Sequence, residues 1–128
     1  MRQIKFRAWH DSSDEMVYFN NRKLVNDEYQ MHHLAMLLAG DYGDVLMQFT
    51  GLTDVNGVEI YEGDILRAYH SQYEEERVAK VTYYNGTFTI GKYWKDGTHD
   101  WRSMEQYAAW ELKVIGNIHE NPELLESC

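Results

Sequence analysis

The stretch that decides the fold is LMQFTGLTDVNGVEIYEGDIL, residues 46–66. It places three glycines between short apolar runs. Asn56-Gly57 is a tight-turn dipeptide, because both residues adopt positive φ at low cost. Gly63-Asp64 predicts a turn into a strand, where an Asp carboxylate fixes the turn by accepting hydrogen bonds from nearby backbone amides. The stretch therefore predicts short strands joined by tight turns.

Alternating apolar residues predict the other strands. Residues 4–8 and 16–19 are typical of an N-terminal hairpin that turns at 11–14. Asn85-Gly86 is the strongest hairpin signal in the chain. We expect Thr50-Gly51 to turn the chain and residues 91–103 to be irregular. The remaining strands are expected at 45–49, 58–60, 64–69, 77–84, 87–90 and 112–118.

Helical patterns are few. Asp27 with Gln30 has the spacing of an N-cap pair, and an apolar stripe at helical spacing follows it, so we expect a helix over 28–39. Asn121-Pro122 predicts one terminal helical turn. The chain of 128 residues is thus predicted to be one mainly β (α+β) domain. Its expected parts are a hairpin and helix over 1–56, an SH3-like β-barrel over 57–120 and a tail over 121–128.

Charge argues against direct nucleic-acid binding. The net charge is −9, whereas binding to phosphates needs a basic face. An acidic surface that mimics nucleic acid and acts on a host DNA-binding protein stays open as an alternative, although solubility explains the charge more simply.

The single cysteine, Cys128, forms no internal disulfide, and no apolar stretch has the form of a signal peptide or the length of a membrane span. We expect a protein of the reducing cytoplasm.

Aromatic residues provide the candidate partner-binding site. The chain has ten Tyr and four Trp, residue types that suit both β-sheets and recognition surfaces. SH3-like barrels bind peptides through aromatic-lined grooves between loops. The alternative is that the two Trp rings cap the barrel as core. The candidate residues are Tyr83, Tyr84, Tyr93, Trp94 and Trp101.

The carboxylates and histidines give little indication of a catalytic or metal-binding site. Glu59, Glu62 and Asp64 invite a metal or acid–base interpretation, but their spacing lacks the further ligands of a calcium loop. His119-Glu120 and His99-Asp100 are sequence neighbours, which face opposite sides of a strand. The sequence has no phosphate-binding or dinucleotide-binding glycine motif and no paired cysteines. We expect no catalytic residues, metal or cofactor; a small metal-dependent nuclease or hydrolase using Glu62 or His119 is the alternative.

Three motifs in order resemble the YopX family of small proteins from bacteriophages and prophages. They are Phe6-Arg7-Ala8-Trp9, the stretch 46–66, and VIGNIHENPELL over 114–125. The resemblance implies a YopX-like fold, with an SH3-like barrel and an N-terminal α+β part, in the cytoplasm of a bacterial host. It implies no activity and no catalytic residues. We therefore expect a non-enzymatic accessory protein that binds a host or phage protein and forms a homo-oligomer, without contact to a membrane.

Overall fold

The computed structural model describes residues 5–10, 13–20, 45–84, 86–93 and 99–126. The side chains of residues 20, 92, 93, 99–101 and 126 are not described. The chain forms two compact units, Met1–Gly51 and Leu52–Cys128. Each unit is described by itself below.

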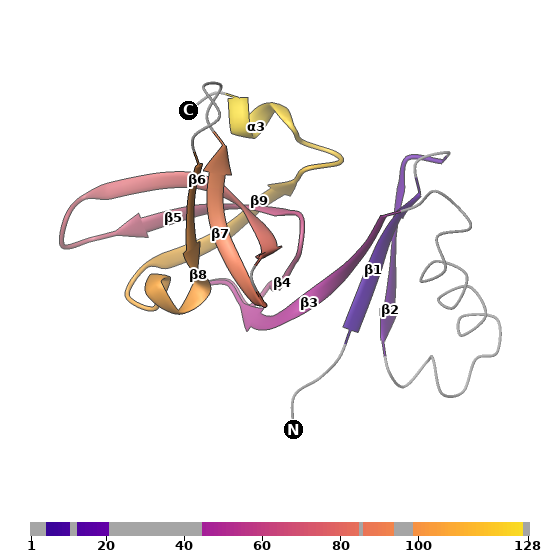
Figure 1. Ribbon diagram of the computed structural model, residues 1–128, viewed down its shortest axis with the longest axis horizontal. Coiled ribbons are helices and arrows are strands. Elements are labelled where there is room, and N and C mark those ends of the chain that lie inside the picture. Colours follow the sequence, from indigo (N-terminus) through magenta and orange to yellow (C-terminus); the bar gives the residue numbers. More distant parts are fainter. Residues whose placement is uncertain (1–4, 11–12, 21–44, 85, 94–98, 127–128) are drawn as a thin grey trace. The chain divides into compact units, whose positions relative to one another are not determined.

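The first unit contains an antiparallel sheet built on an N-terminal hairpin (Figure 1). Strand β1 (Lys5–His10) pairs with β2 (Glu15–Asn20) and, on its other side, with β3 (Val45–Thr53). The order of this sheet is β2-β1-β3-β4, where β4 (Glu59–Tyr61) and the end of β3 belong to the second unit. A small core forms around Ala8 and Phe19, and Phe6, Val17 and Leu46 pack against it. The predicted hairpin is confirmed.

Strand β3 continues through Gly51, where the sequence predicted a turn. Gly51 lies within Val45–Thr53 and has a φ of 90°. A glycine with positive φ inside a strand is typical of a local irregularity such as a bulge, because it lacks the Cβ that would oppose this conformation. The expectation that Thr50-Gly51 reverses the chain was therefore wrong, and the first reversal of the stretch 46–66 comes at Asn56-Gly57.

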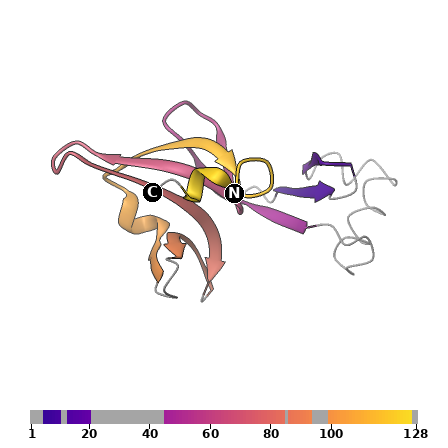
Figure 2. The same cartoon turned by 90° about the horizontal axis from the view of Figure 1, so that it is seen from above.

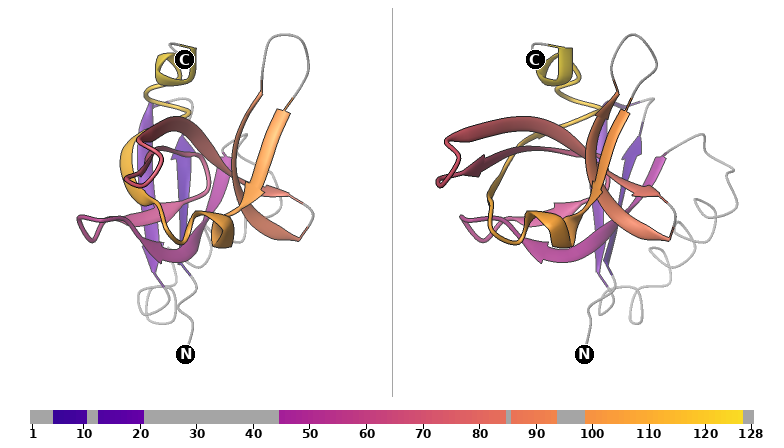
Figure 3. Two further views of the ribbon diagram at one scale, coloured as in Figure 1. Left: turned by 90° about the vertical axis from the view of Figure 1, so that its left-hand side faces the viewer. Right: turned by 60° about the vertical axis from the view of Figure 1, so that its left-hand side comes forward.

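The second unit is a curled half-barrel of five antiparallel strands (Figures 2 and 3). Their order is β8-β7-β6-β5-β9. Tight turns join β5 to β6 and β6 to β7, and Gly86, with a φ of 79°, lies in the second of these turns. The strands are β5 (Asp64–His70), β6 (Glu75–Tyr84), β7 (Thr87–Tyr93), β8 (His99–Ser103) and β9 (Glu111–Asn117).

Residues 91–103, expected to be irregular, contain two strand segments. Strand β7 extends to Tyr93, and β8 returns alongside it with Gly91 opposite Trp101. The sequence hides this pairing because its apolar residues do not alternate. Since β8 is the outermost strand of its sheet, only one of its edges needs a strand partner, and its sequence is less constrained than that of a central strand.

The core of the second unit is a cluster of buried side chains from the half-barrel and from β4. Ile60, Leu66, Val81, Phe88 and Ile90 are buried there. Ile60 comes from β4 of the other sheet. The other four come from β5, β6 and β7, where the alternation seen in the sequence places them on one face of the half-barrel. Met104 and Tyr107 of the short helix η1 (Met104–Tyr107) complete this core.

The end of the chain folds back onto the sheet. Asn121 accepts a hydrogen bond from the Asn117 N–H through its side-chain oxygen, at 3.3 Å, and donates its own N–H to the Asn117 carbonyl, at 2.8 Å. The terminal helix α3 (Glu123–Glu126) then begins, and the expected turn after Asn121-Pro122 is confirmed. Helix α3 contacts β6.

The protein is mainly β, with two antiparallel sheets and little helix among the described residues. The second sheet is a curled half-barrel at the place where the sequence predicted an SH3-like barrel. The helix expected over 28–39 lies outside the described residues. No helix in the described part of the chain is long and apolar enough to span a membrane.

Candidate partner-binding site

The five aromatic residues selected from the sequence fall on three strands and a neighbouring segment. Tyr83 and Tyr84 end β6 and are 52% and 46% exposed. Tyr93 ends β7 opposite His99, and Trp101 lies on β8 opposite Gly91, but the side chains of both are outside the described part. Trp94 is outside the described residues as well. These three positions stay predictions.

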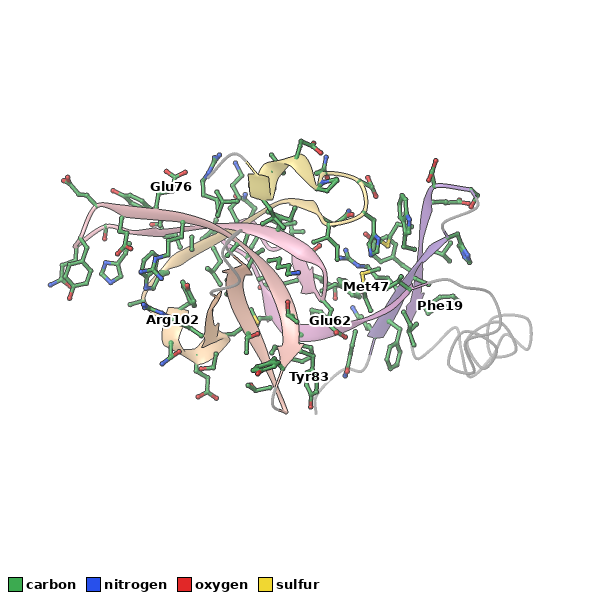
Figure 4. The ribbon with its side chains drawn as sticks, turned by 45° about the horizontal axis from the view of Figure 1, so that its top comes forward. Phe19, Met47, Glu62, Glu76, Tyr83 and Arg102 are labelled. Carbon is green, nitrogen blue, oxygen red and sulfur yellow. The ribbon has the colours of Figure 1, made fainter. Side chains whose placement is uncertain are left out.

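Tyr83 and Tyr84 do not share one surface. Tyr83 lies opposite Phe88 in the register, and their rings make a T-shaped contact with centroids 5.1 Å apart. Phe88 belongs to the core, so Tyr83 extends the core face at the end of the hairpin. Tyr84 is its neighbour along the strand and therefore faces the opposite side of the sheet. Figure 4 shows Tyr83 and Glu76 at the two ends of β6.

A second aromatic group, which the sequence did not reveal, lies toward the other end of β6. We call it the Trp110 surface. It joins the end of β5 and the following turn, β6, the end of η1, and the segment between η1 and β9. Its members are His70, Tyr73, Arg77 and Trp110, together with Tyr107, which is buried and belongs to the core as well.

Ring contacts hold the Trp110 surface together. The His70 ring lies between Tyr73, with centroids 4.6 Å apart, and Trp110, at 5.1 Å in an edge-on arrangement. Tyr107 makes a further edge-on contact with Trp110 at 5.2 Å. Such tilted and edge-to-face pairs are favourable geometries for aromatic rings, so each side chain helps to fix its neighbours.

Arg77 is the charged centre of this surface. Its guanidinium carbon lies 5.4 Å from the Trp110 ring centroid, a cation–π distance. Both Nε and Nη2 lie 2.8 Å from the Glu75 carboxylate. Burial alone would lower the pKa of Arg77, but hydrogen bonds to Glu75 and Tyr107 outweigh burial and raise the pKa. The guanidinium is therefore permanently charged and held in one orientation.

The Trp110 surface has the composition of a protein recognition site. Tyr73 is 67% exposed, although its ring is in contact with His70. Trp110 and Arg77 are partly buried, which leaves part of each side chain accessible. Trp, Tyr and Arg dominate the binding energy of protein interfaces, especially where neighbours hold them rigid. The sequence signal is weak because these residues lie up to forty positions apart; only the strand register brings them together.

The carboxylates Glu59, Glu62 and Asp64 lie at the start of β4, in the turn between β4 and β5, and at the start of β5. Asp64 is buried, and its Oδ2 accepts a hydrogen bond of 2.8 Å from the Tyr61 N–H. This bond closes the turn, with Gly63 between them at a φ of 84°. Glu59 and Glu62 are partly buried. In the described part of the chain, no three His, Cys, Asp or Glu side chains gather as a metal site. The metal-dependent enzyme stays an untested prediction.

Asp54 stabilises the turn at Asn56-Gly57 and joins it to β9, a role that the sequence did not predict. Its Oδ1 accepts hydrogen bonds from the N–H groups of Asn56 and Val58, at 2.8 and 2.9 Å. Its Oδ2 accepts a third from Val114, sixty residues away, at 2.9 Å. Burial acts to raise the pKa of Asp54, but these three donors together lower the pKa below its ordinary value. The signal in the sequence is Asp54-x-Asn56-Gly57, a turn in which an Asp can accept bonds from the following amides.

The two neighbouring His–carboxylate pairs have different surroundings. His119 and Glu120 both donate their backbone N–H groups to the Asn117 side-chain oxygen, at 3.0 and 2.9 Å. They therefore belong to the turn that leads to α3. His99 and Asp100 lie on β8, where their side chains are not described.

Comparisons with known proteins identify one family. The family model described as YopX protein matches residues 5–126. The crystal structure of protein EF1440 from Enterococcus faecalis is 28% identical, with a TM-score of 0.55 over 95% of this chain and 97% of that chain. The crystal structure of protein YopX from Bacillus subtilis has the same fold, at 19% identity and a TM-score of 0.53, over 94% of this chain and 97% of that chain. No curated protein matches. Because the family model covers almost the whole chain, the protein belongs to the YopX family.

Proposed function

We propose that this YopX family protein is a non-enzymatic module that binds another protein through the Trp110 surface. It acts in the cytoplasm of a bacterial host as a phage or prophage accessory protein, and its half-barrel is an SH3-like barrel. Barrels of this kind commonly bind extended peptides in aromatic-lined grooves beside their loops. The Trp110 surface likewise lies beside a turn and an inter-strand segment.

One observation carries the proposal: the accessible Tyr73 ring packs on His70, which is part of an aromatic and cationic network. An exposed tyrosine alone is common on protein surfaces. Tyr73 is 67% exposed and also contacts His70, which in turn contacts Trp110. A rigid ring loses little conformational entropy when a partner covers it, so its contact area contributes more to affinity.

Affinity capture with matched variants tests the proposal. The parent protein, Tyr73→Ala and Tyr18→Ala are each immobilised and exposed to a lysate of lysogenic host cells. Tyr18 is the control because it is also exposed, at 56%, but lies on β2 of the first unit. Both substitutions remove an accessible ring, so their folds are expected to survive. Circular dichroism verifies the folding of each variant.

The expected result is a protein that the parent and Tyr18→Ala retain and that Tyr73→Ala loses. Trp110→Phe, which keeps an aromatic ring at the site, should retain part of the binding. Equal capture by the parent and Tyr73→Ala, with both folded, would show that the Trp110 surface is not the binding site.

A further inference from the structure

The outer edge of the half-barrel at β8 carries a self-complementary charge pattern. β8 ends the strand order, and among the described strands it pairs only with β7 (Figure 3). The backbone of such an edge strand presents N–H and C=O groups that can pair with a further strand. The opposite edge of the same sheet differs. On β9, the Leu112 carbonyl accepts a bond from Val55, and the Val114 N–H donates to Asp54.

The sequence of β8 is His99-Asp100-Trp101-Arg102-Ser103. When two copies of this strand pair in antiparallel fashion about Trp101, Asp100 of each copy lies directly opposite Arg102 of the other. Directly opposite residues of an antiparallel pair lie on the same face and interact, and opposite charges there are favourable. A shift of the register by one residue loses both complementary pairs. The charges therefore select one alignment.

The register inside each protomer supports this alignment. Asp100 lies opposite Lys92 on β7, and Arg102 lies opposite Ile90. In the register of the paired edge, position 100 would lie between position 92 of its own chain and position 102 of the second copy. Arg102 is exposed and already interacts within its own chain. Its guanidinium carries five N–H donors, which is enough to add a carboxylate of a second copy.

Charges on an edge strand can also serve to prevent pairing. Charges prevent pairing when all of them have the same sign, because a row of like charges repels a second copy of the strand. The β8 pattern has one acid and one base placed symmetrically about its central residue, so in this alignment a second copy meets attraction at both positions. Charge complementarity therefore favours a second copy of this chain as the occupant.

We propose that two copies of the protein associate through antiparallel pairing of β8 with β8, centred on Trp101. This deepens the proposed protein-binding role by naming one partner as the chain itself. The two five-stranded sheets would then form one continuous sheet. Because the paired strands have only five residues each, the interface is small and the dimer dissociates on dilution.

Charge reversal tests both the edge and the alignment. The dissociation constant is measured by sedimentation velocity over a series of concentrations for the parent, Asp100→Arg, Arg102→Asp and the variant with both substitutions. In the dimer of either single variant, positions 100 and 102 carry the same charge, so both cross-strand pairs become repulsive. Each single substitution should therefore weaken the dimer about tenfold. The double substitution restores opposite charges and should return the dimer. An equimolar mixture of the two single variants should form mixed dimers, since their charges are complementary.

Asp100→Arg places a second basic residue at the register position opposite Lys92 of its own chain, so circular dichroism verifies its fold. Amide hydrogen exchange of the parent provides a measurement that needs no variant. Exchange over residues 99–103 should slow as the concentration rises, whereas exchange over 111–117 should not change. A parent that stays monomeric, or a dimer that neither single substitution weakens, would overturn the proposal. Such a result would leave capture by the Trp110 surface unaffected, so the two proposals can fail separately.

Discussion

At the scale of single residues, the family motif near the end of the chain is explained by packing. A Cβ built on Gly116 would lie 2.6 Å from Asn121 Oδ1 and 2.9 Å from Asn121 Cβ. The Asn121 side-chain oxygen accepts a hydrogen bond from the Asn117 N–H. The Asn117 side-chain oxygen in turn accepts hydrogen bonds from the N–H groups of His119 and Glu120. Gly116, Asn117 and Asn121 are thus interdependent, and the motif fixes the turn that leads to α3.

Gly116→Ala should therefore lower the free energy of unfolding by about 1–3 kcal/mol, the usual cost of overpacking. In the Asn121→Gly background the added methyl group has room, so the cost should fall by at least about 0.5 kcal/mol. Gly57→Ala is the matched control, because Gly57 has a φ of 81° but no atom within 4 Å of its Cβ position. Its cost should be the same in both backgrounds. Urea denaturation measures all four values, and an unchanged cost of Gly116→Ala would exclude the Asn121 contact as its cause.

Asp54 predicts a pH dependence of stability. Its pKa in the folded protein is below the ordinary value of 3.8, so the native state is favoured when the carboxylate is ionised. This contribution is present above the unfolded pKa and is lost as the pH falls through the lower folded pKa. Asp54→Asn cannot accept bonds at both positions, and at pH 7 it should cost about 1–3 kcal/mol.

The deficit of Asp54→Asn relative to the parent should shrink once the pH drops below about 4. Urea denaturation at pH 7 and at pH 3 measures the difference. Glu120→Gln, which changes an exposed carboxylate, should differ little from the parent at either pH. A deficit of equal size at both pH values would mean that the charge of Asp54 is not responsible.

At the scale of elements, the β5–β6 hairpin contains two Arg–Glu ion pairs in different surroundings. Arg67 and Glu76 lie 2.8 Å apart, with side chains 49% and 55% exposed. Arg77 and Glu75 lie equally close, but Arg77 is 28% exposed and also contacts Trp110 and Tyr107. The first pair is a solvated surface pair, whereas the second belongs to a network.

Arg67→Ala should therefore change the free energy of unfolding by less than about 1 kcal/mol, the usual range for exposed ion pairs. Arg77→Ala removes charge-assisted hydrogen bonds together with packing on Trp110, so it should cost about 1–3 kcal/mol. Thermal denaturation followed by tryptophan fluorescence compares the two variants. Equal costs would indicate that the contacts of Arg77 do not stabilise the hairpin.

The sequence predicted most elements because their signals are local. Asn56-Gly57, Asn85-Gly86 and Asn121-Pro122 each determine a reversal or a helix start through the conformations of a few residues. The errors occurred where pairing partners decide the structure. Gly51 is accommodated inside β3, and β8 takes its extended form alongside β7. Neither result follows from local preferences, since tertiary contacts override them.

At the scale of the whole molecule, the chain is divided into two compact units, each with its own buried cluster. The fold class was predictable because turn spacing and strand alternation persist along the chain. The candidate site was not, because the Trp110 surface combines residues 70–77 with residues 107 and 110. Their proximity depends on the pairing of β5 with both β6 and β9, which no local pattern reveals.

The central claim is that the Trp110 surface binds a protein, and the affinity for the captured partner tests this claim most directly. Isothermal titration calorimetry measures the dissociation constant for the parent, Tyr73→Ala and Tyr18→Ala. We expect Tyr73→Ala to weaken binding by about tenfold or more, as loss of an aromatic anchor does, and Tyr18→Ala to bind like the parent. An equal dissociation constant for folded Tyr73→Ala and the parent would contradict the claim.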